Sequence, residues 1–146
     1  MAESRPRLYA AHQQLQAGLA NGEVDIAVNY KARGLQWVHD GLPLGIQYPE
    51  EGAIAVTFGA CLATYAQNSD AGYSYLAAMI DPDAMAGLAE ASFYAPANSK
   101  ATLSDELREI IDFTPEERAK MHFLDYAYVA ENSAAWLEWW NKSFAI

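Results

Sequence analysis

The chain has 146 residues, of which 52% are hydrophobic and 19% are charged, as expected for one globular domain and not for a disordered segment. Nineteen acidic and nine basic side chains give a formal charge of −10, which argues against a nucleic-acid partner because phosphate binding depends on Lys and Arg. Cys61 is the single cysteine, which excludes an intrachain disulfide, and no apolar stretch approaches the roughly 18 residues of a membrane-inserted span.

The first third of the chain alternates between helical and strand patterns. Apolar residues recur at helical spacing over residues 8–20, and Asn21-Gly22 supplies a helix stop. Residues 24–28 alternate apolar and polar side chains with the two-residue period of a strand. A short helix is expected over 31–40 and a second strand over 44–48. The order strand, helix, strand predicts a parallel, right-handed βαβ unit.

The rest of the chain is mainly helical in pattern. The apolar, partly β-branched run at 53–58 predicts a buried strand. Helix starts are then expected at Ser69-Asp70, at Asp81-Pro82, at Ser104 and at Thr114, where Thr114 and Glu117 have the spacing of a capping box. The last helix is expected over 130–144. The predicted class is α/β with helix in excess of strand.

Four segments in this order resemble a known family: Gly22 to Tyr30, Tyr48 to Ile54, Asp81-Pro82-Asp83, and Tyr94 to Asn98. The chain resembles the carboxyl-terminal part of bacterial extracellular solute-binding proteins, in particular the spermidine/putrescine-binding group that delivers ligands to ABC importers. The likeness covers residues 8–103 and implies part of a two-lobed type II periplasmic-binding-protein fold. It places residues 1–56 in the second lobe as a βαβ segment, residues 57–102 in the first lobe, and residues 103–146 in the second lobe again as helices.

The same resemblance implies a set of ligand-binding residues. Ligands of open parallel sheets bind beyond the carboxyl ends of the strands, which here is the edge formed by Asn29, Tyr30 and Lys31. The family places an aromatic side chain against the ligand at the position of Tyr30 and a second one at Tyr94. The alternatives are that Tyr30 covers the local core with its hydroxyl in water, and that Tyr94 plugs a helix end.

The polyamine pattern is incomplete. Polyamine binders carry a tryptophan and, two residues later, an aspartate at the positions of Val56 and Phe58, and a buried cation without a carboxylate partner is costly. Lys31 and Arg33 lie near the expected helix start and would suit a carboxylate or a zwitterion. The implied ligand set is therefore Asn29, Tyr30, Lys31, Phe58 and Tyr94, and the ligand class stays open between a polyamine-like amine and an amino-acid-like zwitterion.

No residue pattern predicts catalysis, a metal or a cofactor. The histidines, His12, His39 and His122, have neither metal-site spacing nor a neighbouring nucleophile motif. Cys61 lies in an apolar run and is expected to be a buried hydrophobe. Trp136, Trp140 and Phe144 recur every four residues along one helical face, a pattern typical of a core or an interface.

The resulting hypothesis is a half-length, non-enzymatic solute-binding protein that holds a small organic solute in a cleft between lobes. The resemblance implies a periplasmic location and an ABC permease as partner, and no signal segment opens the chain, which fits a fragment, a mature form or a truncated gene product. Because half of such a fold would expose apolar surface, we expect homo-oligomers, with exchange of elements between copies as one route. The alternative is a self-associating interaction module of the same fold that has lost ligand binding.

Overall fold

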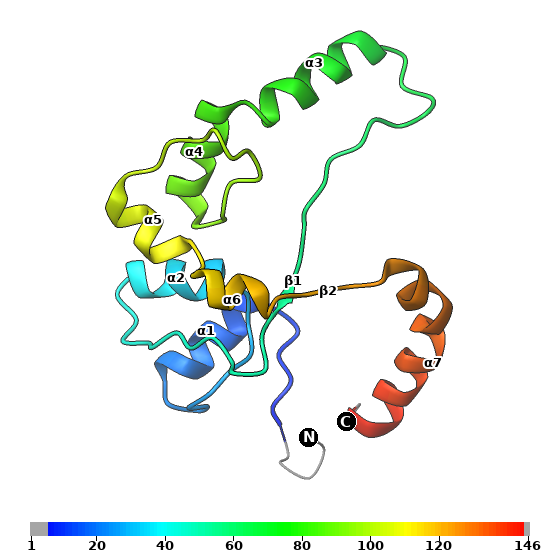
Figure 1. Ribbon diagram of the computed structural model, residues 1–146. Coiled ribbons are helices and arrows are strands. Elements are labelled where there is room, and N and C mark those ends of the chain that lie inside the picture. Colours follow the sequence, from blue (N-terminus) through cyan, green and yellow to red (C-terminus); the bar gives the residue numbers. More distant parts are fainter. Residues whose placement is uncertain (1–5, 145–146) are drawn as a thin grey trace.

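The structure is a computed structural model that describes residues 6–144. These residues form seven helices and two short strands (Figure 1). The helices are α1 (His12–Ala20), α2 (Lys31–His39), α3 (Ser69–Met79), α4 (Pro82–Ser92), α5 (Asp105–Ile111), α6 (Pro115–Ala119) and α7 (Tyr126–Phe144), and the strands are β1 (Ile54–Ala55) and β2 (His122–Phe123).

The small core lies where α2 meets α4 and α5. Its buried apolar side chains are Ala32 and Trp37 of α2, Ala89 of α4 and Ile111 of α5. The small residues allow the helices to approach closely, and Trp37 is only 4% exposed. Three helices from distant parts of the chain are therefore joined in one block, and α3 packs onto α4 at its edge.

The helix starts follow the local signals predicted from the sequence. Asp81 accepts hydrogen bonds from the backbone N–H groups at the start of α4, with Pro82 as the first helical residue. Ser104 caps α5 in the same way, and Thr114 and Glu117 form the expected capping box at the start of α6. Helix α3 begins at Ser69 as expected, although Asn68 provides its cap. These signals depend on residues within one turn, so they operate without tertiary contacts.

The predicted strands are mostly absent, which corrects the local βαβ prediction. Residues 24–28 and 44–48 flank α2 as expected but form no strand pairing, and the run at 53–58 pairs only at Ile54 and Ala55. The partner is β2, which the sequence patterns missed; the pairing is parallel, with Ile54 opposite His122 and Ala55 opposite Phe123. A strand needs a neighbour to satisfy its backbone, and the described residues offer no neighbour to the other two segments.

A tight turn ahead of β1 fastens the middle of the chain to α6 and β2. Gly52 has a φ of +100°, and a Cβ there would lie 2.0 Å from the carbonyl oxygen of Lys120. Lys120 in turn donates from Nζ to the carbonyl of Glu50 at 2.9 Å, and the hydroxyl of Tyr48 donates to the carbonyl of Glu117 at 2.8 Å. Only glycine fits both the backbone angle and the close approach.

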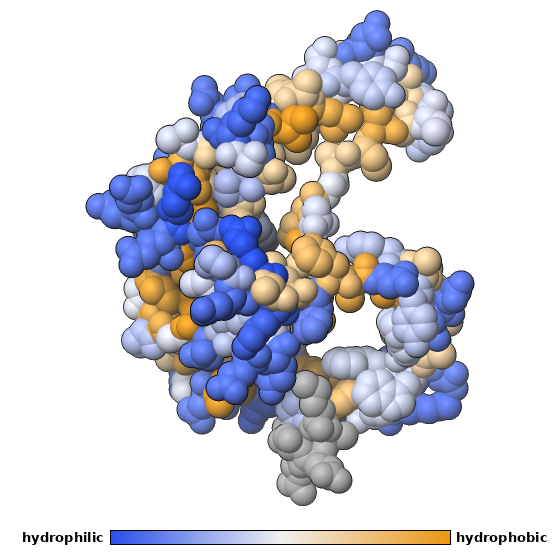
Figure 2. Space-filling view, in the orientation of Figure 1, coloured by the Kyte–Doolittle hydropathy of each residue, from blue (hydrophilic) through white to orange (hydrophobic). Residues whose placement is uncertain are grey.

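Two parts of the chain extend away from the block. Residues 56–68 run as an arm from β1 to α3, and α7 stands clear of the other helices beyond β2 (Figures 1 and 2). Helix α7 begins at Tyr126 and not at the predicted residue 130, and none of its residues is buried. Cys61 lies exposed on the arm, contrary to the expected burial, because none of the helices and strands described for residues 6–144 covers it. None of the helices formed by residues 6–144 combines the length and apolarity that a bilayer crossing needs.

Candidate functional site

Three of the aromatic side chains expected at a ligand site lie together. The ring of Phe58 is 6.4 Å from that of Tyr30 and 5.5 Å from that of Tyr94, measured between centroids, and both pairs meet edge to face. We call these three residues the ring cluster. Tyr30 is 44% exposed and Phe58 66% exposed, so the cluster presents ring surface to solvent and does not form part of the buried core.

The three rings come from three separate segments. Tyr30 is the N-terminal cap residue of α2, and Phe58 follows β1 on the arm. Tyr94 follows α4, where Phe93 adopts a left-handed conformation with a φ of 59° and turns the chain. This conformation is uncommon for a residue other than glycine, and it lets the chain reverse immediately after the helix. The ring cluster therefore depends on tertiary structure, with Phe58 as its centre.

Asn29 and a small hollow lie next to the ring cluster. The Oδ1 atom of Asn29 accepts from the N–H of Tyr30 at 2.9 Å, which fixes the entry to α2. Asn29 also lines a hollow of about 200 Å³ at the start of α1. His12 lines the same hollow, and its ring lies 6.0 Å from that of Tyr30. The sequence patterns did not point to His12, because its contact with Tyr30 is made between segments 18 positions apart.

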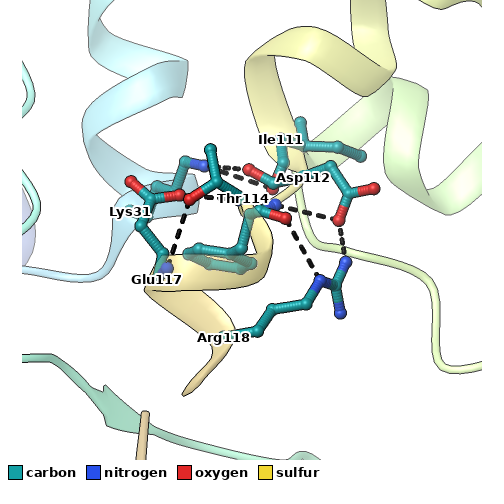
Figure 3. Close-up of polar contacts among 7 residues, drawn as sticks. Lys31, Ile111, Asp112, Thr114, Glu117 and Arg118 are labelled. Atoms are coloured by element: carbon teal, nitrogen blue, oxygen red, sulfur yellow. Dashed lines mark hydrogen bonds and ion pairs between the residues drawn. The ribbon is translucent and has the colours of Figure 1, made fainter. Parts of the chain in front are cut away.

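Lys31 is not brought to the ring cluster. Its Nζ donates to the carbonyl of Asp112 at 2.7 Å and to that of Ile111 at 3.3 Å, and lies 4.2 Å from the centroid of the Phe113 ring (Figure 3). These carbonyls lie at the C-terminal end of α5, where the backbone carbonyls of a helix have no intrahelical partners. Lys31 therefore ties α2 to the end of α5, and a ligand role would compete with these bonds.

Burial has a cost for the Lys31 ammonium. Loss of hydration lowers the pKa of Lys31 below its usual 10.5, the carboxylate of Glu117 raises it in part, and Arg118 lowers it. Arg118 is itself paired with the carboxylate of Asp112 and donates from Nε to the carbonyl of Phe113 at 3.1 Å. Figure 3 shows Lys31, Arg118 and Glu117 gathered around the chain between α5 and α6. This group has the features of a structural junction.

The ring cluster could bind a flat or cationic group, but it offers no metal chemistry. Aromatic rings attract ammonium groups over their faces and pack against apolar stems. Within residues 6–144, no group of three His, Cys, Asp or Glu side chains could hold a metal ion. The ion pairs of that same stretch, Arg7–Glu23, Asp112–Arg118 and Glu138–Lys142, involve no residue of the ring cluster.

Comparisons with known proteins agree with the resemblance drawn from the sequence. The chain is 31% identical over 133 residues to the putrescine-binding periplasmic protein PotF of Escherichia coli (strain K12), an alignment that covers 82% of this chain and 35% of the relative. The chain thus spans about a third of the length of that relative. No solved structure matches it significantly. Residues 4–115 match the family described as bacterial extracellular solute-binding protein, so the chain belongs to the bacterial extracellular solute-binding proteins.

Proposed function

We propose that this chain contributes part of a binding site for a small organic solute, and that the ring cluster is the ligand-contacting surface. The observation that carries the proposal is the convergence of Tyr30, Phe58 and Tyr94 from three segments into one partly exposed group of rings. Rings that served only the core would be expected to be buried. Affinity would come from aromatic packing together with a few polar groups.

The ring cluster is proposed to lie between two lobes, with Tyr30 from one lobe and Phe58 and Tyr94 from the other. In this proposal, residues 1–56 and 103–146 belong to one lobe and residues 57–102 to the other, and the arm of residues 56–68 is one of the crossings. Closure of the lobes on a solute would be the signal presented to an ABC permease on the periplasmic side of the membrane.

Two ligand classes are compatible with the ring cluster. A polyamine-like amine is supported by the likeness to a protein named as putrescine-binding. An amino-acid-like zwitterion is supported by Phe58, which provides no carboxylate to pair with a second ammonium group. Both classes share an ammonium group and a short carbon chain, which aromatic rings accommodate.

A thermal-shift and calorimetric titration tests the proposal with putrescine, spermidine, amino acids and small carboxylates as probes. We expect at least one ammonium-bearing probe to raise the melting temperature. Tyr30→Ala should weaken its binding about 2- to 30-fold, because an ammonium–ring contact contributes about 0.5–2 kcal/mol. Tyr30→Phe should retain most of the affinity, since the ring face is preserved.

Tyr75→Ala is the matched control. Tyr75 lies on α3, is 66% exposed and takes no part in the ring cluster, so its removal should leave binding unchanged. The proposal would be contradicted if no probe bound, or if Tyr75→Ala weakened binding as much as Tyr30→Ala.

A self-associating interaction module is the second candidate function. It is favoured by α7, which carries exposed Trp136, Leu137 and Trp140 and buries none of its residues against the described part of the chain. Apolar surface of this kind commonly becomes an interface. This candidate requires the rings to be covered by another subunit, so it predicts that no probe binds in the titration, and solute binding that Tyr30→Ala weakens would contradict it.

A further inference from the structure

The turn that leads into Tyr94 has a strained backbone. Among residues 6–144, Phe93 is the one residue other than glycine with a positive φ, at 59°. This left-handed conformation is unfavourable for a residue with a Cβ, and glycine adopts it more readily. A phenylalanine at this position therefore needs a contact that offsets the strain.

That contact is made with α2. The ring of Phe93 lies 5.5 Å from the imidazole of His39, measured between centroids, with the planes inclined by 54°. His39 is the last residue of α2, and Tyr30 is the residue that caps its start. One nine-residue helix therefore contacts the turn before Tyr94 at one end and provides a ring of the ring cluster at the other.

Hydrogen bonds hold the loop on both sides of Tyr94. The N–H of Tyr94 donates to the hydroxyl of Ser92 at 3.5 Å, and that hydroxyl donates to the carbonyl of Leu88 at 2.6 Å. Further along, Nδ2 of Asn98 donates to the carbonyl of Ile80, at the end of α3, at 2.7 Å. Both sets of bonds tie the loop to its own segment of the chain, whereas the aromatic contact ties it to α2.

We propose that Phe93 and His39 are positioning residues for the ring cluster. They hold the ring of Tyr94 against Phe58 and fix its place relative to Tyr30. Their importance for solute binding rests on the proposed function. In the proposed division into lobes, His39 belongs to the lobe of Tyr30 and Phe93 to the lobe of Tyr94. The contact then favours the arrangement in which rings from both lobes meet.

The alternative is that Phe93 serves only to end α4. A left-handed residue is a common way to finish a helix, and in that role glycine is the preferred residue. Phe93→Gly separates the two interpretations, because it preserves the turn and removes the ring. If the turn alone positions Tyr94, this variant leaves Tyr94 in place. If the ring contact is required, Tyr94 moves.

Fluorine NMR of the solute-free chain, labelled with fluorotyrosine, reports the position of Tyr94 directly. The signal of Tyr94 is the one that disappears in Tyr94→Phe. Phe58→Leu shows how this signal depends on the neighbouring ring. We expect His39→Ala and Phe93→Gly both to shift the Tyr94 signal. His39→Phe, which restores a ring opposite Phe93, should return the signal towards its position in the wild type.

Val38→Ala is the matched control. Val38 lies beside His39 in the last turn of α2, is 39% exposed and takes no part in the contact with Phe93, so its truncation should leave the Tyr94 signal unchanged. His39 is itself exposed, so His39→Ala should change the melting temperature little. A shift of the Tyr94 signal without loss of stability distinguishes positioning from a general effect on folding.

A double-mutant cycle, with putrescine as the probe, tests the consequence for binding. His39→Ala should weaken binding about 2- to 10-fold, the size expected for the loss of one aromatic pair. In a Tyr94→Ala background it should have no further effect, because it acts through Tyr94. In a Tyr30→Ala background its effect should persist.

Two results would overturn the proposal. One is a Tyr94 signal that stays unchanged in His39→Ala and Phe93→Gly, or that shifts equally in Val38→Ala. The other is a loss of putrescine binding in His39→Ala that adds fully to the loss in Tyr94→Ala. If no probe of the titration binds the wild type, the proposed function fails, and the NMR measurement still decides whether Phe93 and His39 hold Tyr94.

Discussion

The block formed by α2, α4 and α5 and the isolated helix α7 use the same kind of residue in opposite ways. Trp37 of α2 is 4% exposed, whereas Trp140 of α7 is 44% exposed and Trp139 is 58% exposed. Both helices carry apolar side chains at helical spacing, but, among the elements of residues 6–144, α2 packs closely on other helices and α7 buries none of its residues. In this chain, the burial of a side chain therefore depends on the presence of a packing partner and not on the apolarity of its segment.

Truncation of a tryptophan in each region is the strongest test of this comparison. Trp37→Ala should lower the free energy of unfolding by about 3–5 kcal/mol, because it removes a ring that is only 4% exposed and leaves a cavity in its place. Trp140→Ala should cost less than about 1 kcal/mol, since its ring contacts mainly Phe144, at 4.6 Å between centroids. Denaturant titration followed by circular dichroism measures both.

If Trp37→Ala does not fold, Trp37→Phe serves as a milder variant. Its free energy of unfolding should lie between those of the wild type and Trp37→Ala. A large loss of stability in Trp140→Ala would contradict this expectation. It would mean that α7 is covered in solution, by a second copy or by another polypeptide.

The junction at Lys31 should give the next largest effect. Lys31→Met removes two hydrogen bonds to the end of α5 and should lower the free energy of unfolding by about 1–2 kcal/mol at neutral pH. Denaturant midpoints of both proteins measure the difference. Arg33→Met is a control on the same helix, and no described bond ties its side chain to α5.

The pH dependence of that difference has a defined sign. The folded chain lowers the pKa of Lys31, so between that lowered value and 10.5 the unfolded chain binds more protons. The free energy of unfolding contributed by Lys31 therefore rises with pH through this window, as deprotonation relieves the cost of burying the charge. The difference between the wild type and Lys31→Met should widen as the pH approaches 10.5, and a constant difference would show that burial does not shift Lys31.

The smallest effect is expected on α7 itself. Glu138→Gln removes the ion pair with Lys142 one turn later, and both side chains are largely exposed. Such pairs contribute less than about 0.5 kcal/mol, and salt screens them. The global denaturant midpoint should not move, and the helical signal should change only slightly at low salt. A clear shift of the midpoint would indicate that α7 unfolds together with the block.

The contrast between the regions also explains which features could be predicted from the sequence. Helix starts at Asp81, Ser104 and Thr114 were predicted because each cap acts within its own turn. The predictions of strands at residues 24–28 and 44–48 were wrong, because strand pairing depends on a distant partner that the described residues do not supply. Strand β2 was missed for the converse reason, since His122 and Phe123 show no strand period and pair only because β1 lies beside them.

The candidate site likewise combines features that could be predicted from the sequence with features that could not. The resemblance singled out Tyr30 and Tyr94 as aromatic ligand positions, and Phe58 stands where the family's aspartate is missing. The structure brings the three rings together, although a role in binding stays a prediction. The position of Lys31 could not be foreseen, because its acceptors lie 80 and 81 residues further along the chain. Contacts of that span depend on how helices pack, and no local pattern encodes them.

The turn at Gly52 has a topological consequence for the arm that follows it. Residues before the arm are fastened to residues after it through the hydroxyl of Tyr48, the β1–β2 pair, and the packing of α2 on α4 and α5. Beyond Phe58, which lies in the ring cluster, the arm therefore connects the two parts of the chain without being needed to hold them together. A single nick by a protease beyond Phe58 should therefore leave two pieces that remain associated.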